Sequence, residues 1–241
     1  MNEKELMKYI PSSTEIAENS ELFAGQIMQF QEMIMMYNCA IREVRTKLEV
    51  LNDELSIRDT HNPIEIIKSR VKKPVSIVDK LRRRGYPVRV ESVMENLKDV
   101  AGIRVICSFI DDIYKVADML ASQDDVKVLE IKDYIKHPKP NGYRSYHMIV
   151  EIPVFFSDRT LPLCVEVQIR TIAMDFWASL EHEMKYKKDV EGADVIVKRL
   201  AEIADQINQT DMEISLANDD DSVALVANIP VARMKHDKGN H

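Results

Sequence analysis

Apolar residues recur every three or four positions along the N-terminal part of the chain. The spacing alternates between four and three without a break, and no proline interrupts it. A 3.5-residue repeat of this kind is typical of a long helix, which at 1.5 Å per residue would extend for about 50 Å. Because such a helix outreaches a small domain, we expect part of its stripe to pack on a partner helix or another subunit. The stripe consists of Phe23, Ile27, Phe30, Ile34, Tyr37, Ile41, Val44, Leu48, Leu51 and Leu55.

The rest of the chain alternates between short apolar runs and amphipathic stretches. A break at 61–63 ends the first helix, and a loop with two prolines and an Asn-Gly pair occupies 133–142. The pattern predicts helices at about 74–84, 91–98, 111–122, 171–187 and 194–217, and strands at 103–109, 126–131, 144–152 and 163–170. These elements predict an α/β (α+β) fold, with a mixed sheet of about four or five strands flanked by helices. We divide the chain into an N-terminal helical arm (1–60), a core (61–190), a C-terminal helix (191–217) and a flexible tail (218–241).

Several residues are expected to serve only the hydrophobic core. The three cysteines, Cys39, Cys107 and Cys164, are far apart and set among apolar residues, which favours reduced thiols of a cytoplasmic protein. Phe176 and Trp177 are expected to pack between a helix and the sheet.

Composition excludes several classes of protein. The chain has 241 residues, of which 45% are hydrophobic and 30% charged, as in an ordinary soluble domain. No apolar run approaches the roughly 20 residues that a bilayer requires, so we expect no membrane span. The segment MNEKELMKYIPSSTE lacks the layout of a signal peptide.

Positive charge is concentrated in one segment of an otherwise acidic chain. The net charge is −7, which argues against a general DNA or RNA binder. Residues 68–89 nevertheless hold nine lysines and arginines and one aspartate. Such a focus of charge can form an anion site. It can equally be a solvated helix face or a patch for RNA, and the charge alone leaves these alternatives open.

Polar side chains gather on three neighbouring segments of the predicted sheet. Strand periodicity places Glu166, Gln168 and Arg170 on one face of the last strand. The runs 99–104 and 142–147 add an acid, arginines, a tyrosine and a histidine. Two carboxylates suit Mg²⁺, cationic side chains neutralise phosphates, and a tyrosine can stack on a purine. These are the parts of a phosphoryl-transfer site, although no P-loop and no G-x-G-x-x-G run is present.

Two other functions are compatible with these residues. The chain could be a non-catalytic interaction protein that uses its long helix and binds RNA through the basic segment. It could also be a nucleotidyltransferase-like enzyme that releases pyrophosphate instead of AMP.

Four segments resemble the small alarmone synthetases of the RelA/SpoT family, and their residues are most similar to those of the RelP-like branch. The runs are HNPIEIIKSRVK (61–72), DVAGIRVICSF (99–109), NGYRSYH (141–147) and EVQIRTIAMDFWASLEH (166–182). The resemblance implies a nucleotidyltransferase-like synthetase core that transfers pyrophosphate from ATP to the 3′-hydroxyl of GDP or GTP. It further implies release of AMP, a role in the stringent or stress response, no hydrolase activity and a homotetramer.

The resemblance also assigns roles to individual residues. Asp99 and Glu166 would hold Mg²⁺, and Glu166 would also activate the 3′-hydroxyl as the catalytic base. ATP would be bound by Arg70, Lys72, Ser76, Lys80, Arg83 and Arg104. GDP or GTP would be bound by Tyr143, His147, Gln168, Arg170 and Asp175. Further candidates near the site are Lys139, Asn141, Arg144, Glu181 and His182.

Overall fold

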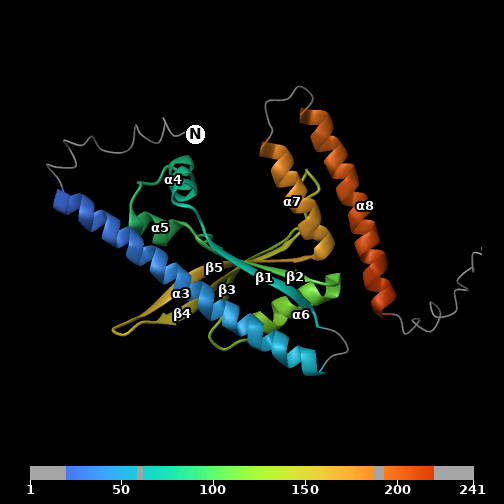
Figure 1. The fold of residues 1–241 in the computed structure, drawn as a ribbon, viewed down its shortest axis with the longest axis horizontal. Helices are drawn as coiled ribbons and strands as arrows, with labels where there is room; N and C mark the ends of the chain where they lie inside the picture. Colours follow the sequence, from blue (N-terminus) through green and yellow to red (C-terminus); the bar gives the residue numbers. More distant parts are fainter. Residues whose placement is uncertain (1–19, 59–61, 187–192, 220–241) are drawn as a thin grey trace, which may run out of the picture.

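The computed structural model describes residues 20–58, 62–186 and 193–219 (Figure 1). Within these ranges it contains a five-stranded mixed sheet and flanking helices, which confirms the predicted fold class. The helices are α3 (Ser20–Arg58), α4 (Pro74–Arg83), α5 (Val90–Asn96), α6 (Ile110–Ala121), α7 (Ile172–Tyr186) and α8 (Ala193–Asp219). The strands are β1 (Ile64–Val71), β2 (Ala101–Cys107), β3 (Lys127–Asp133), β4 (Tyr146–Phe155) and β5 (Thr160–Thr171).

The sheet brings together strands that are far apart in the sequence. Its order is β1-β2-β5-β4-β3, and only the β2–β5 pair is parallel. Register places Gly102 of β2 opposite Glu166 of β5, and Gln168 of β5 opposite both Arg104 and His147. The three runs that carry the predicted chemistry therefore meet in the middle of the sheet.

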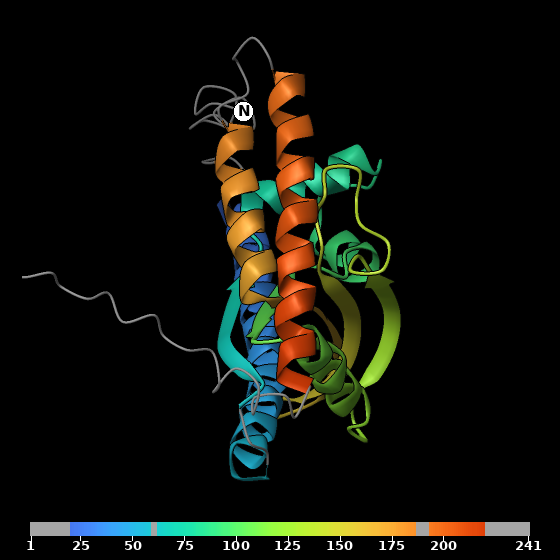
Figure 2. The same ribbon diagram turned by 90° about the vertical axis from the view of Figure 1, so that its right-hand side faces the viewer.

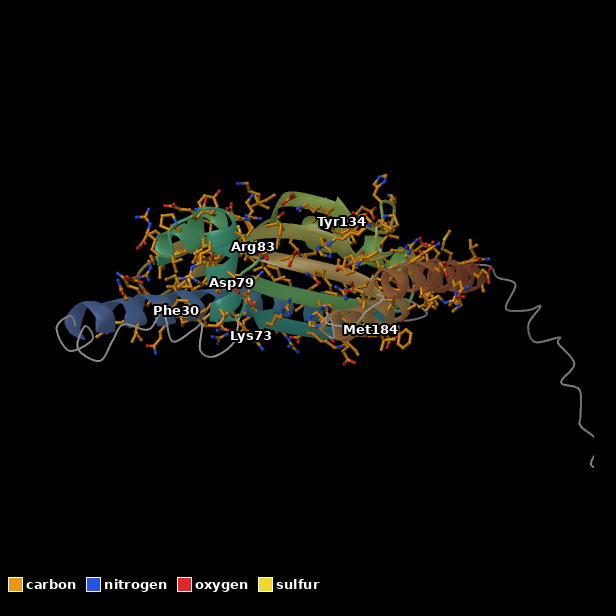
Figure 3. The ribbon with its side chains drawn as sticks, turned by 90° about the horizontal axis from the view of Figure 1, so that it is seen from above. Phe30, Lys73, Asp79, Arg83, Tyr134 and Met184 are labelled. Atoms are coloured by element: carbon orange, nitrogen blue, oxygen red, sulfur yellow. The ribbon has the colours of Figure 1, made fainter. Side chains whose placement is uncertain are left out.

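One face of the sheet forms the hydrophobic core. Val165, Val167 and Ile169 of β5 are fully buried there, in a single cluster with side chains of α3 and α6. The opposite face is polar and lies between α4 and α5 at one end and α7 and α8 at the other (Figure 3). The alternation predicted for β5 thus separates the core from the site.

The long N-terminal helix packs along its own sheet. From Tyr37 to Leu55 its stripe is buried, and the helix packs against β1, β2, β4 and β5 and against α6. Ile27, near the N-terminal end of the described stripe, is exposed, and contact of this end with another chain stays a prediction. The side chain of Phe23 and the tail from 220 onward lie outside the described residues.

Leu48→Ala is expected to destabilise the protein by about 2–5 kcal/mol, because it opens a cavity in the core. Leu48 has no exposed surface, whereas Val50 on the same helix is 59% exposed. Val50→Ala should therefore change the free energy of unfolding by less than about 0.5 kcal/mol. Urea unfolding of both variants measures the difference, and equal values would contradict the described docking of α3.

Three expectations about packing need correction. Trp177 is buried, but it lies between α7 and α8 rather than on the sheet, and its indole donates to the carbonyl of Leu200 at 2.9 Å. Figure 2 shows these two helices running side by side. Phe176 is 58% exposed, since neighbouring side chains on a helix point about 100° apart. Of the cysteines only Cys107 is fully buried, and all three are free thiols.

The helices within the described ranges carry no segment with both the length and the apolar character needed to cross a bilayer.

Candidate active site

A cavity of about 210 Å³ opens on the polar face of the sheet, where β1, β2 and β5 run side by side. Its walls include six of the residues predicted from sequence, drawn from three separate parts of the chain. They are Arg70, Lys72, Asp99, Arg104, Glu166 and Gln168. Lys68, which was not predicted, also lines the cavity. A pocket lined by both carboxylate and cationic side chains can hold a phosphorylated ligand together with a metal cation.

Asp99 lies just before β2 and is held by two lysines. Its Oδ2 atom accepts from the ammonium groups of Lys72 at 2.5 Å and Lys80 at 2.6 Å. Burial opposes the charged carboxylate, but the two lysines outweigh it and keep the pKa of Asp99 below its usual value. The other oxygen, Oδ1, is buried and has no hydrogen-bond partner among the described residues. An orphaned carboxylate oxygen beside a cavity is suited to a hard cation.

Glu166 faces the same cavity from β5. Its carboxylate accepts from Nε2 of Gln168 at 2.9 Å and lies 3.3 Å from Nδ1 of His147. Burial disfavours its charged form, but the hydrogen bonds from His147 and Gln168 prevail, so the pKa of Glu166 is lowered. The negative charge of Asp99 acts in the opposite direction, which shows that the two acids share one electrostatic environment.

Glu166 is one of five side chains that form a closed ring of polar contacts. From His147 the ring continues to the Tyr143 hydroxyl at 2.8 Å, which accepts from Arg170 at 2.8 Å. Arg170 also donates to Gln168 at 2.9 Å, and Gln168 returns to Glu166. Burial lowers the pKa of His147 despite its contact with Glu166, so the imidazole is neutral near pH 7. In that state the network assigns the proton to Nδ1, facing Glu166, while Nε2 accepts from Tyr143.

Tyr143 also belongs to an aromatic cluster. Its ring lies edge to face with Tyr134, at 6.0 Å between centroids, and the ammonium of Lys139 sits 4.6 Å from the Tyr143 centroid. Lys139 is equally close to Tyr134, at 4.5 Å. Sequence reasoning missed Tyr134, although an aromatic residue nine positions before Tyr143 in a proline-containing loop was a usable signal.

The loop that carries Tyr143 is braced by the two C-terminal helices. Asn141 donates to the buried Glu181 of α7 at 2.9 Å, and Arg144 pairs with Asp205 of α8 at 2.9 Å. Arg144 also donates to the carbonyl of Ala204 at 3.3 Å. These predicted residues therefore support the loop instead of lining the cavity. His182 is exposed on α7.

Gly142→Ala is expected to raise about tenfold the KM of a ligand that contacts the Tyr143 loop, with little change for a ligand held between β1 and β2. Gly142 has φ +85°, and a Cβ there would lie 2.5 Å from Cβ of Ala204, so the loop must separate from α8. Gly85 has a similar φ, +75°, with open space around it. Gly85→Ala therefore carries the same backbone strain without the clash. Equal steady-state constants for the two variants would contradict the bracing of the loop.

The remaining predicted residues lie around the cavity in different ways. Asp175 contacts three cationic side chains, Lys68, Arg104 and Arg170, at 3.1–3.4 Å. Ser76 and Arg83 are exposed on α4 and are not among the residues that line the cavity. Figure 3 shows Arg83 at the α4 end of the polar face.

The sequence is similar to a known protein family and to named bacterial proteins. The family described as a region found in RelA/SpoT proteins matches residues 69–191. GTP pyrophosphokinase YwaC of Bacillus subtilis is 45% identical over 172 residues, which cover 71% of this chain and 82% of YwaC. GTP pyrophosphokinase YjbM of the same organism is 36% identical over 187 residues, which cover 78% and 87% of the two chains.

A solved structure is similar over nearly its whole length. The small alarmone synthetase 1 of Bacillus subtilis, bound to its product pppGpp, superposes with a TM-score of 0.72 at 34% identity. The match covers 79% of this chain and 97% of that one. A shared fold, shared sequence and a shared family region all point the same way, and the chain belongs to the RelA/SpoT family as a small alarmone synthetase.

Proposed function

We propose that this protein is a GTP pyrophosphokinase that transfers the β,γ-pyrophosphoryl group of ATP to the 3′-hydroxyl of GDP or GTP and releases AMP. The observation that carries the proposal is the placement of Asp99 and Glu166 on one cavity, together with the cations that a triphosphate requires. The names of the relatives and the product bound in the similar structure support the same reaction.

The donor nucleotide is assigned to the side of the cavity formed by β1 and β2. Arg70, Lys72 and Arg104 line it there, and Lys80 reaches it through its ion pair with Asp99. Arg70 and Arg104 would stack on the two sides of the adenine. Lys72 and Lys80 would offset the charge that builds up on the transferred group. Ser76 and Arg83 on α4 remain proposed contacts to the phosphates.

The acceptor nucleoside is assigned to the polar face of β4 and β5, beside the cavity. Tyr143 would stack on guanine, with Lys139 near its ring. Glu166 would accept the proton of the 3′-hydroxyl as that oxygen attacks the β-phosphorus and the bond to the α-phosphate oxygen breaks. The neutral His147 and Gln168 hold the two oxygens of Glu166 in place. Because these bonds lower the pKa of Glu166, orientation of the hydroxyl contributes more here than proton affinity.

Mg²⁺ fits the donor set at this cavity. The orphaned Oδ1 of Asp99 and the carboxylate of Glu166 are hard oxygen ligands. A bound Mg²⁺ would neutralise phosphate charge and polarise the phosphorus that is attacked. Lys72 and Lys80 hold Oδ2 of the Asp99 carboxylate, so the ion would take the oxygen that neither lysine contacts.

The proposed setting is a homotetramer in the cytoplasm, as the resemblance implies. Apolar side chains exposed on two of the described helices are compatible with subunit contacts: Ile27 and Met28 on α3, and Phe176, Leu180 and Met184 on α7. Sedimentation at micromolar concentration tests this proposal, which a monomer would refute.

Labelled ATP distinguishes the proposed reaction from the two alternatives. With GDP and Mg²⁺, the α-phosphate label is expected in AMP and the γ-phosphate label in a guanosine tetraphosphate. A nucleotidyltransferase would place the α label on the acceptor and the γ label in pyrophosphate. A non-catalytic RNA-binding protein would move neither label. Incubation of the purified tetraphosphate with the enzyme should release no pyrophosphate, and release would contradict the absence of hydrolase activity.

A further inference from the structure

One carboxylate connects the cavity with the neighbouring polar face of β4 and β5. Asp175, near the start of α7, has a side chain that is only 13% exposed. Its Oδ1 accepts from Arg104 of β2 at 3.1 Å and from Arg170 of β5 at 3.2 Å. Its Oδ2 lies 3.4 Å from the ammonium of Lys68 on β1. A single acid thus holds cations from three strands of the sheet.

The two guanidinium groups on Oδ1 belong to different subsites. Arg104 lines the cavity on the side assigned to ATP and is 31% exposed, so it can meet a ligand. Arg170 is almost fully buried and donates to the hydroxyl of Tyr143, the proposed platform for guanine. One oxygen atom of Asp175 therefore accepts hydrogen bonds from an arginine of the donor side and from an arginine of the acceptor side.

Because both arginines bond to the same oxygen, the strength of the Arg104 contact depends on the strength of the Arg170 contact. The two guanidinium groups repel one another, and the charge of Arg104, together with burial, lowers the pKa of Arg170. When ATP stacks on Arg104 and draws it away from Oδ1, the repulsion falls and Oδ1 becomes more available to Arg170. Arg170 then holds Tyr143 more firmly, and less conformational freedom is lost when guanine stacks on it.

We propose that Asp175 is a positioning residue that couples the two nucleotide subsites, so that each nucleotide binds more tightly when the other is present. This inference rests on the proposed function, since it takes the donor and acceptor assignments from it. Coupling between two ligands is reciprocal. The factor by which the donor raises acceptor affinity must equal the factor by which the acceptor raises donor affinity.

Binding constants measured without turnover test the coupling. The probe is α,β-methylene ATP, in which the bond that breaks in the reaction is replaced. Calorimetry with Mg²⁺ gives its Kd with and without saturating GDP, and the Kd of GDP with and without the analogue. In the wild-type protein we expect both ratios to be about tenfold. In Asp175→Asn both should fall to within about twofold of unity, and Asp175→Glu should restore part of the effect.

Asp205→Asn is the matched control, because it removes one carboxylate charge from the acceptor side while leaving the contacts of Asp175 intact. It should change the Kd of GDP measured without the analogue, but the ratio of the Kd values without and with the analogue should stay near tenfold. A residue that only touched guanine would weaken GDP binding equally with and without the analogue. An unchanged ratio in Asp175→Asn, or no coupling in the wild type, would therefore overturn this inference. Transfer of label by the wild-type enzyme reports separately on the proposed function.

Discussion

Glu166→Gln is expected to lower the rate of AMP release by about 10²- to 10⁴-fold, the range typical of the loss of a general base. Glutamine has nearly the same shape, so the strand and the cavity should remain intact. It cannot take the proton of the 3′-hydroxyl, and its amide would turn a donor toward groups that now donate to Glu166. The measurement is single-turnover release of AMP at saturating ATP and GDP.

Glu151→Gln provides a control on the same face of the sheet. Glu151 pairs with Lys127 at 3.1 Å and does not line the cavity, so its variant should keep near-normal activity. Both variants should bind nucleotides as the wild type does. If Glu166→Gln retained AMP release within about tenfold of wild type, Glu166 would not be the base.

Asp99→Asn is expected to reduce turnover at least about 100-fold and to raise the concentration of Mg²⁺ required for half-maximal rate. The substitution removes the negative charge that Lys72 and Lys80 share, so two ammonium groups at a half-buried site lose their counter-charge. It also replaces a hard anionic ligand by a neutral amide, which holds a divalent ion less strongly. The measurement is the initial rate over a series of Mg²⁺ concentrations.

Asp79→Asn removes the one acid from the basic segment 68–89 and changes the net charge by the same amount. Asp79 lies on α4 and is labelled in Figure 3. Its variant should leave the dependence on Mg²⁺ unchanged. Equal behaviour of the two variants would show that Asp99 acts through general electrostatics and not through the ion.

The site residues of β5 could be predicted from sequence because their pattern is local. Alternation within one strand already separates Val165, Val167 and Ile169 from the polar positions, and the structure buries these three completely. The register between β2 and β5 could not be predicted, since it depends on strands that are about sixty positions apart.

The edge strand β1 escaped prediction for an identifiable reason. A register shift between Ile64 and Ile66 breaks the alternation, so Ile64 is buried while Ile66 is 47% exposed. A shift of one residue turns every following side chain to the other face. Lys68 and Arg70 consequently point to the cavity from a segment whose pattern resembles neither a strand nor a helix.

The contacts that organise the site also lie beyond local patterns. Asp175 and Lys68 are separated by 107 positions. The resemblance assigned Asp175 to the guanine nucleotide, which stays a prediction, and the structure adds that its carboxylate lies among three cations. Side-chain pairings of this kind depend on how α7 packs on the sheet. The spacing of apolar residues along the chain does not predict that packing.

The central claim is that both nucleotides and one metal ion share the polar face of the sheet. Its most direct test is a crystal structure with Mg²⁺, α,β-methylene ATP and GDP. We expect the ion about 2.1 Å from carboxylate oxygens of both Asp99 and Glu166, with the guanosine 3′-hydroxyl about 3 Å from Glu166. An ion bound to neither carboxylate, or a guanosine on the face covered by α3, would contradict the account.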